Sequence, residues 1–319
     1  MCVKINGQFT LTAMMVPLCI SLTVILFTAS RAIASDTNTT NKNIYYETSF
    51  IQDEKKAEAL WLELNDQQYV NTSMTFSFAE ATKALEQSNE KYKVYGLRRV
   101  QNISFDFLLF GETVRTVQLF ANGLLMLAEQ LYPKQLTEQP YFASVQPDFD
   151  LYPAEVVSFD FIRWFQNDSQ LTVTWENMEF KPENSNFTFY TFQTTLFKTG
   201  DIVIVVKSIT NEHILRNVTV TLMDGFIMPN EAIHPYPHHS FKFVYENISN
   251  WSLIHMKPWP TCLNQKNLHS CLLPNRSLWA PDTIYDTNCS WCPSANFCVS
   301  LQDRILRKWT KNNCDREAA

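Results

Sequence analysis

The chain has 319 residues, of which 45% are hydrophobic and 18% are charged, and its formal net charge is -6. This composition is typical of a globular protein, and the length favours two domains. The basic residues form no long run, so we expect no nucleic-acid partner. The few glycines are too widely spaced for a phosphate-cradling loop or a dinucleotide fingerprint, and we expect no cofactor.

Residues 11–29 carry no charge and are mostly apolar, and Lys4 precedes them. Ala32-Ile33-Ala34 then offers a small-x-small cleavage site, so residues 1–34 are predicted to be a secretory signal peptide. The alternative is an uncleaved anchor, because the apolar run is nearly long enough to span a bilayer. Pro17 weakens a spanning helix and favours cleavage. No second apolar segment of spanning length follows, so we expect a secreted mature chain unless something else tethers it to a membrane.

Two further features indicate an oxidising compartment in which proteins are glycosylated: recurring sequons, and six cysteines that all lie in the last part of the chain. Sequons of the form Asn-x-Ser/Thr recur along the chain, and Asn167 is the best acceptor because it lies in a turn between expected strands. Asn250 and Asn288 are weaker candidates, because Asn247 crowds the first and a cysteine follows the second. The predicted N-glycosylation sites are Asn38, Asn71, Asn102, Asn167, Asn186, Asn217, Asn247 and Asn275.

Residues 35–91 are predicted to form an N-terminal leader with short helices. The stretch from Ser35 to Lys42 is polar and flexible in character. Residues 53–64 have helical spacing, and residues 78–85 favour a second short helical turn. The apolar face of the first helix would carry Ala57, Leu60, Trp61 and Leu64.

Residues 92–256 are predicted to form an antiparallel β domain with a sandwich or barrel-like fold, so the protein is expected to be mainly β. Strands are expected at 103–109, 114–120, 124–127, 217–223 and 241–245, with hairpin turns at Gly111 and at Asn122-Gly123. Residues 129–150 and 233–239 read as loops because they contain several prolines.

The clearest strand pattern runs from Val157 to Val206. Apolar residues alternate at Leu171, Val173 and Trp175, which is typical of a strand with one buried face. The apolar phase shifts after Phe189, which predicts a β-bulge between Phe189 and Tyr190. Residues 198–201 favour a hairpin turn, and residues 202–206 favour a central strand that is covered on both faces.

Residues 261–316 are predicted to form a small cysteine-rich module after the stiff connector 257–260. At roughly 55 residues a hydrophobic core alone is marginal, so disulfides are expected. Cys289-Ser290-Trp291-Cys292 also permits zinc or redox chemistry, but no second ligand pair and no βαβ setting accompany it. The six cysteines of this region allow 15 connectivities. They are Cys262, Cys271, Cys289, Cys292, Cys298 and Cys314.

Other patterns leave two alternatives open. His234, His238 and His239 lie in a proline-rich stretch and offer a metal-binding module, although adjacent histidines in such a loop are more often solvated. The chain has no nucleophile elbow and no zincin helix, so we expect a protein without enzymatic activity and without a bound metal. A secreted hydrolase or a carbohydrate-binding module is the alternative.

The order and spacing of several motifs resemble the nidogen-like β domain of the plexin-domain-containing proteins of the tumour endothelial marker type. The cysteine-rich end resembles that family's plexin-semaphorin-integrin (PSI) module. The resemblance covers nearly all of the expected mature chain. It rests on Tyr45-Tyr46, Asn102 to Phe107, Phe110-Gly111, Asn122-Gly123, Phe161 to Trp175, Phe189 to Gly200, Leu222 to Phe226, Pro258 to Cys262 and Asn288 to Cys292.

The resemblance implies a cell-surface protein with one membrane span and no catalytic activity, whose partners are matrix components or a secreted ligand such as pigment epithelium-derived factor. This chain departs from the family because no membrane span follows its cysteine-rich end. It also lacks the second and eighth cysteines of a full PSI module, which normally bond to each other. The pairs that the resemblance implies are Cys262–Cys289, Cys271–Cys298 and Cys292–Cys314.

Overall fold

The computed structural model describes residues 39–42, 45–64, 73–77, 98–128, 141–148, 155–181, 188–210, 217–227, 235–272, 289–300, 309 and 312–314. These residues all belong to one compact unit, Asn38–Ala319. The fold is mainly β and antiparallel, and its C-terminal region holds three disulfides. None of the helices in these ranges is long and apolar enough to cross a membrane.

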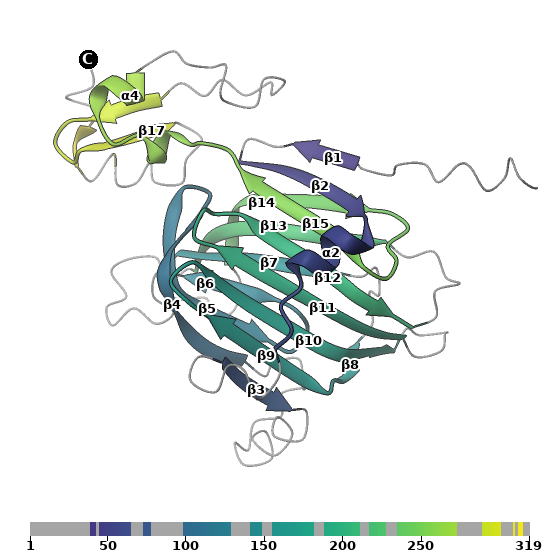
Figure 1. The fold of residues 1–319 in the computed structure, drawn as a ribbon. Helices are drawn as coiled ribbons and strands as arrows, with labels where there is room; N and C mark the ends of the chain where they lie inside the picture. The colour runs from purple at the N-terminus through teal and green to yellow at the C-terminus, as the bar shows by residue number, and fades with distance from the viewer. Residues whose placement is uncertain are drawn as a thin grey trace, which may run out of the picture. The chain divides into compact units, whose positions relative to one another are not determined.

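The larger sheet has nine strands, and its two outermost strands come from the N-terminal quarter of the chain (Figure 1). A ninth strand, β8 (Glu155–Ser158), pairs with β10 beside the main path. The other strands lie in the order β1 (Thr39–Lys42), β2 (Tyr46–Gln52), β15 (Ser252–Pro258), β12 (Ile202–Ile209), β11 (Thr188–Phe197), β10 (Gln170–Lys181), β9 (Phe161–Gln166) and β3 (Ser73–Ser77).

The smaller sheet has six strands and faces the larger one (Figure 1). Its order is β14 (Pro235–Tyr245), β13 (Val218–Ile227), β7 (Tyr141–Asp148), β6 (Leu125–Ala128), β5 (Glu112–Phe120) and β4 (Arg98–Leu109). The apolar side chains on the inner faces of the two sheets form one continuous core. The expected sandwich is therefore confirmed.

Trp175 on β10 joins the two sheets. Its indole is fully buried, stacks on the ring of Phe192 with the centroids 5.0 Å apart, and donates a hydrogen bond of 2.9 Å to the carbonyl of Phe120. The predicted inward alternation of Leu171, Val173 and Trp175 is confirmed, because all three lie in the shared core. Burying side chains of this size stabilises the fold by about 1.5–3 kcal/mol each.

The Asn122-Gly123 hairpin between β5 and β6 packs directly on this core. Gly123 has a φ of +85°, and a Cβ atom there would lie 2.8 Å from the Phe192 ring. Only glycine combines that left-handed backbone with such a close approach. The predicted hairpin is confirmed, and so is the turn at 198–201, where Gly200 also has a positive φ.

β12 is covered on both faces, as its unbroken apolar run predicts. Ile202, Ile204 and Val206 belong to the core between the sheets, whereas Val203 and Val205 belong to a second cluster on the outer face. Helix α2 (Glu54–Leu60) supplies Ala57 to that second cluster and is capped by the Asp53 side chain.

The segment after α2 is held on the outer face by a buried amide. Gln193 is 1% exposed; its Oε1 atom accepts from the backbone N–H of Leu62, and its Nε2 atom donates to the Leu62 carbonyl, both at 2.9 Å. The same Nε2 group donates to Thr174 at 2.8 Å. A buried amide with its bonds satisfied in this way fixes the register of the covering segment.

The N-terminal part differs from the predicted helical leader of residues 35–91. This part contributes β1, β2 and β3 to the larger sheet, and α2 is its only described helix. The helix ends at Leu60, because the backbone of Trp61 is already extended. Of the predicted apolar face, Ala57 and Trp61 pack in one cluster, whereas Leu60 is 41% exposed. The predicted helical turn at 78–85 lies outside the described residues.

Two proline-containing stretches that were predicted as loops are strands. Residues 141–148 form β7 in the middle of the smaller sheet, and Pro147 lies opposite Val220 in its ladder with β13. Residues 235–239, part of the predicted histidine loop, open the edge strand β14. An edge position tolerates proline because the outer N–H groups of the strand have no ladder partner to lose.

The predicted bulge lies on the partner strand. The ladder between β10 and β11 shifts between Trp175 and Met178, where Asn177 has a φ of +50°, and not between Phe189 and Tyr190. Asn177 is held there by hydrogen bonds with Asp160 and Thr191. A second shift, between β11 and β12, falls after Thr191.

Candidate functional site

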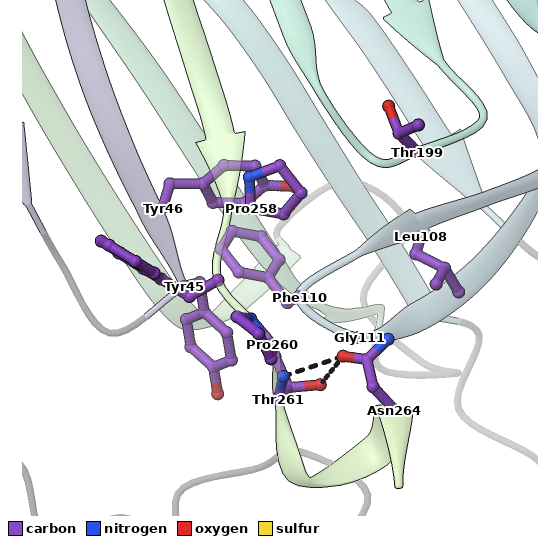
Figure 2. A pocket seen from close by; sticks show the side chains of 11 residues that line it. Tyr45, Tyr46, Leu108, Phe110, Gly111, Thr199, Pro258, Pro260, Thr261 and Asn264 are labelled. Atoms are coloured by element: carbon purple, nitrogen blue, oxygen red, sulfur yellow. Dashed lines mark hydrogen bonds between the residues drawn. The ribbon is translucent and has the colours of Figure 1, made fainter. Parts of the chain in front are cut away.

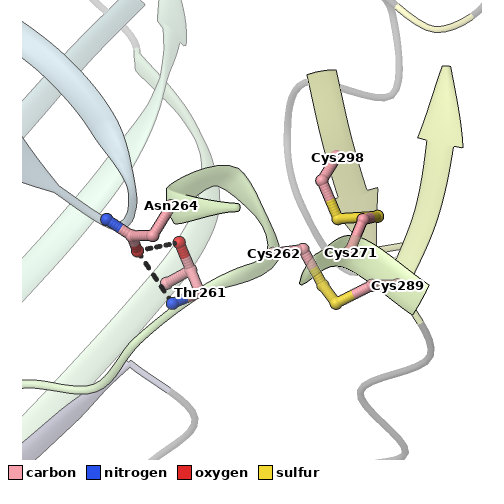
Figure 3. Close-up of a disulfide and its surroundings, with 6 residues drawn as sticks. All are labelled: Thr261, Cys262, Asn264, Cys271, Cys289 and Cys298. Atoms are coloured by element: carbon pink, nitrogen blue, oxygen red, sulfur yellow. Dashed lines mark hydrogen bonds between the residues drawn. A yellow bond between two sulfur atoms is a disulfide. The ribbon is translucent and has the colours of Figure 1, made fainter. Parts of the chain in front are cut away.

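The connector between the sandwich and the cysteine module is fixed by hydrogen bonds at both ends. β15 ends at Pro258, and the N–H of Trp259 then donates to the carbonyl of Tyr45 at 2.7 Å. A short 3-10 helix, Cys262–Asn264, follows. The Oδ1 atom of Asn264 accepts from both the N–H and the hydroxyl of Thr261, at 2.8 and 2.7 Å (Figure 3).

The hairpin between β4 and β5 packs against this connector through a glycine. Gly111 has a φ of +81°, and a Cβ atom there would lie 2.6 Å from the Thr261 hydroxyl and 3.0 Å from the Leu263 side chain. Real Cβ atoms do not approach so closely. Glycine at this position therefore permits the close contact between the sandwich and the start of the cysteine module.

A pocket of about 290 Å³ opens where these parts meet, and we call it the junction pocket (Figure 2). Its floor is aromatic: Tyr45 and Phe110 meet edge to face with the ring centroids 5.1 Å apart, and Tyr46 meets Phe110 at 6.1 Å. Its rim is polar, because the side chains of Thr199 and Asn264 are exposed. The lining residues are Tyr45, Tyr46, Leu108, Phe110, Gly111, Thr199, Pro258, Trp259, Pro260, Thr261 and Asn264.

A pair of hydrogen-bonded residues, Asp201 and His255, lies next to the lining residue Thr199. The Nε2 atom of His255 lies 2.8 Å from Asp201, and the other Asp201 oxygen accepts from the Thr199 hydroxyl. The hydrogen bond with His255 is the main reason that the pKa of Asp201 lies below its usual range. Burial, together with the charge of Asp201, raises the pKa of Tyr46, which keeps that phenol neutral.

In the cysteine module the structure joins Cys262 to Cys289, Cys271 to Cys298 and Cys292 to Cys314. These are the pairs that the family resemblance implies. The first two bridges lie side by side (Figure 3), with the sulfur atoms of Cys262, Cys289 and Cys298 within 4.8 Å of one another. All three sulfurs are oxidised, so they offer no thiolate to a metal ion.

Each bridge anchors a different part of the small module. The short helix α4 (Leu268–Leu272) holds Cys271. The hairpin of β16 (Cys289–Cys292) and β17 (Phe297–Ser300) holds Cys289 and Cys298, which are the bridge partners of Cys262 and Cys271. Cys292 and Cys314 pack with Val299 and Trp309 in an apolar cluster of their own. The module therefore combines disulfides with a very small core, as expected for its size.

Four of the predicted glycosylation sites lie on described residues. Asn102, Asn167 and Asn247 are exposed, and Asn217 is partly exposed. Asn167 has its Oδ1 atom bonded to the hydroxyl and the N–H of Ser169, which belongs to the same sequon. The sites that lie outside the described residues are Asn38, Asn71, Asn186 and Asn275.

Two of these sequons occupy the outer face of the smaller sheet. Asn102 is on its edge strand β4, opposite Thr116, and Asn217 directly precedes β13. Asn247 lies at the far end of β14, next to Gln52. None of the described sequons contributes a residue to the junction pocket.

The side chains of the histidines that suggested a metal module lie outside the description. His234 is not among the described residues, and only the backbone of His238 and His239 is described, in β14. The junction pocket itself was not predicted as a site, because its residues come from four separate stretches of the chain and no spacing links them.

No protein-family model matches the chain, and no solved structure gives a significant match to it.

Proposed function

We propose that this chain is a non-catalytic extracellular glycoprotein of the plexin-domain-containing type, which binds matrix components or a secreted protein ligand at a cell surface. The β sandwich with the junction pocket supplies the contact surface, and the cysteine module fixes the orientation of that surface. The observation that carries the proposal is the joint between them: Gly111, Thr261 and Asn264 pack and bond so that the pocket has a fixed shape. A preformed surface lowers the entropic cost of binding.

The acid–base character of the pocket also supports binding over catalysis. A general acid or base works best with a pKa near the operating pH. The pKa of Asp201 is moved down and that of Tyr46 is moved up, so both move away from neutrality. Three disulfides and exposed sequons support an oxidising, extracellular setting.

The test is expression of the chain in a secreting animal cell, followed by binding measurements on the released or membrane-held product. Surface plasmon resonance against a panel of matrix glycoproteins and against pigment epithelium-derived factor should give saturable binding to at least one. Reduced and alkylated protein is the control and should not bind. Retention in the cytosol with free thiols would refute the proposal, as would the absence of any saturable partner.

A further inference from the structure

We propose that the junction pocket binds one neutral hexose unit of an extracellular glycan. This inference rests on the proposed function and specifies it, because it names the chemical group on the partner that the pocket receives. The argument uses the pocket's floor, its rim, its charge and its size.

The apolar lining suits the apolar face of a sugar ring. Pro258, Trp259 and Pro260 are partly or fully exposed and form rigid apolar walls. The rings of Tyr45, Tyr46 and Phe110 are almost fully buried and are fixed against each other edge to face, so they hold the base of the pocket in place. A hexose presents a patch of C–H groups on one face of its ring, and that patch packs on aromatic and apolar side chains. Rings held in this way lose little entropy when a ligand arrives.

The rim offers hydrogen-bonding groups in defined roles. The Oδ1 atom of Asn264 already accepts two bonds from Thr261, so its Nδ2 group is the donor that the exposed side chain presents. The hydroxyl of the exposed Thr199 donates to Asp201, so its lone pairs are left to accept. One donor and one acceptor complement sugar hydroxyls, each of which both donates and accepts.

The charge of the lining restricts the kind of sugar. Each of the eleven lining residues is uncharged at neutral pH, because Tyr46 keeps its proton and the lining contains no acid, lysine, arginine or histidine. A sialic acid or a sulfated sugar would lose the hydration of its anion here without gaining a cation in exchange. An uncharged pocket therefore matches an uncharged hexose.

The size of the pocket decides between a sugar and a proline-rich peptide. A volume of about 290 Å³ lies at the lower end of the range of roughly 300–1,000 Å³ for small-ligand sites, which suits one ring. A proline-rich peptide docks as an extended segment along a groove. A pocket of this volume receives one ring and not several successive residues.

The test is saturation-transfer NMR of the intact secreted chain with the methyl glycosides of glucose, galactose, mannose and N-acetylglucosamine. We expect saturable, weak binding of at least one glycoside. Asn264→Asp keeps an oxygen for Thr261 and replaces the outward amide by an anionic oxygen, so it should weaken binding at least tenfold. Asn296→Asp makes the same chemical change in the turn between β16 and β17 and should leave binding unchanged.

A second variant tests the rim of the pocket without altering the connector, whose change could weaken binding by itself. Thr199→Val removes one rim acceptor without touching Thr261 or Asn264, and it should also weaken glycoside binding. No binding of any neutral glycoside, or binding that both variants leave unchanged, would overturn the inference. So would displacement of the glycoside by a proline-rich peptide that binds more tightly. If a protein partner still binds after such a result, the proposed function survives and only the sugar site fails.

Discussion

Replacing Gly111 by alanine tests whether the sandwich and the cysteine module are joined rigidly. The φ of +81° costs a residue with a Cβ about 1–2 kcal/mol. The new Cβ would also lie 2.6 Å from the Thr261 hydroxyl, so the Thr261–Asn264 turn must move. Losing one of its two hydrogen bonds adds about 1 kcal/mol. We therefore expect Gly111→Ala to lower the free energy of unfolding by about 2–3 kcal/mol.

Urea unfolding followed by tryptophan fluorescence measures the loss, and amide hydrogen exchange of residues 258–265 locates it. Gly123→Ala is the matched control, because its φ of +85° costs the same but its Cβ would meet Phe192 in the core. It should destabilise the fold without faster exchange in the connector. Gly111→Asn separates the cost of the backbone conformation from the steric cost. Asparagine tolerates a left-handed backbone, so only the steric contact with Thr261 remains. Unchanged stability and unchanged connector exchange in Gly111→Ala would refute the rigid joint.

Three further predictions concern the sandwich. Trp175→Phe removes the indole N–H bond between the sheets and should cost about 2–3 kcal/mol in urea unfolding, while a change below about 0.5 kcal/mol would contradict that role. Gln193→Leu removes both hydrogen bonds to the Leu62 backbone, so limited proteolysis should cut residues 61–64 faster than in the parent chain. Equal cleavage rates would show that Gln193 does not hold this segment. The pKa of Asp201 lies below its ordinary 3.8 because of His255, so its stabilising effect is complete above that value and is lost as the pH falls through the lowered pKa. The gap in urea midpoint between the parent chain and Asp201→Asn should therefore shrink as the pH falls below about pH 4; a gap that grows in that range would show that the sign is wrong.

The strands that could be predicted from the sequence are those whose two faces differ in polarity, or those that contain an unbroken apolar run. Leu171, Val173 and Trp175 alternate because one face of β10 meets the core. Residues 202–206 of β12 are all apolar because Ala57 of α2 packs on Val203 and Val205 on the second face. Both patterns are local, so periodicity alone reports them.

The elements that were missed depend on partners distant in sequence. β7 contains Pro147 and β14 begins at Pro235, and these stretches become strands through their ladders with β13 and, for β7, also with β6. β2 lacks a long alternation and is defined by its pairing with β15, about 200 residues later. The bulge was misplaced because a change of phase in one strand can be absorbed by an extra residue in its partner.

The candidate site could not be predicted from the sequence for a similar reason. Tyr45, Gly111, Thr199 and Thr261 share no motif, and the close approach of Gly111 to Thr261 follows only from the folded chain. The signal that was available was indirect: a glycine in a predicted hairpin turn and a connector stiffened by prolines. The sequence placed both features correctly without showing that they touch.

The position of β15 has a mechanical consequence. This strand is hydrogen-bonded to β12 on one side and to β2 on the other, and it runs directly into the cysteine module. Tension applied to the module along the strand would load both ladders in shear, so that many bonds resist together and do not open one by one.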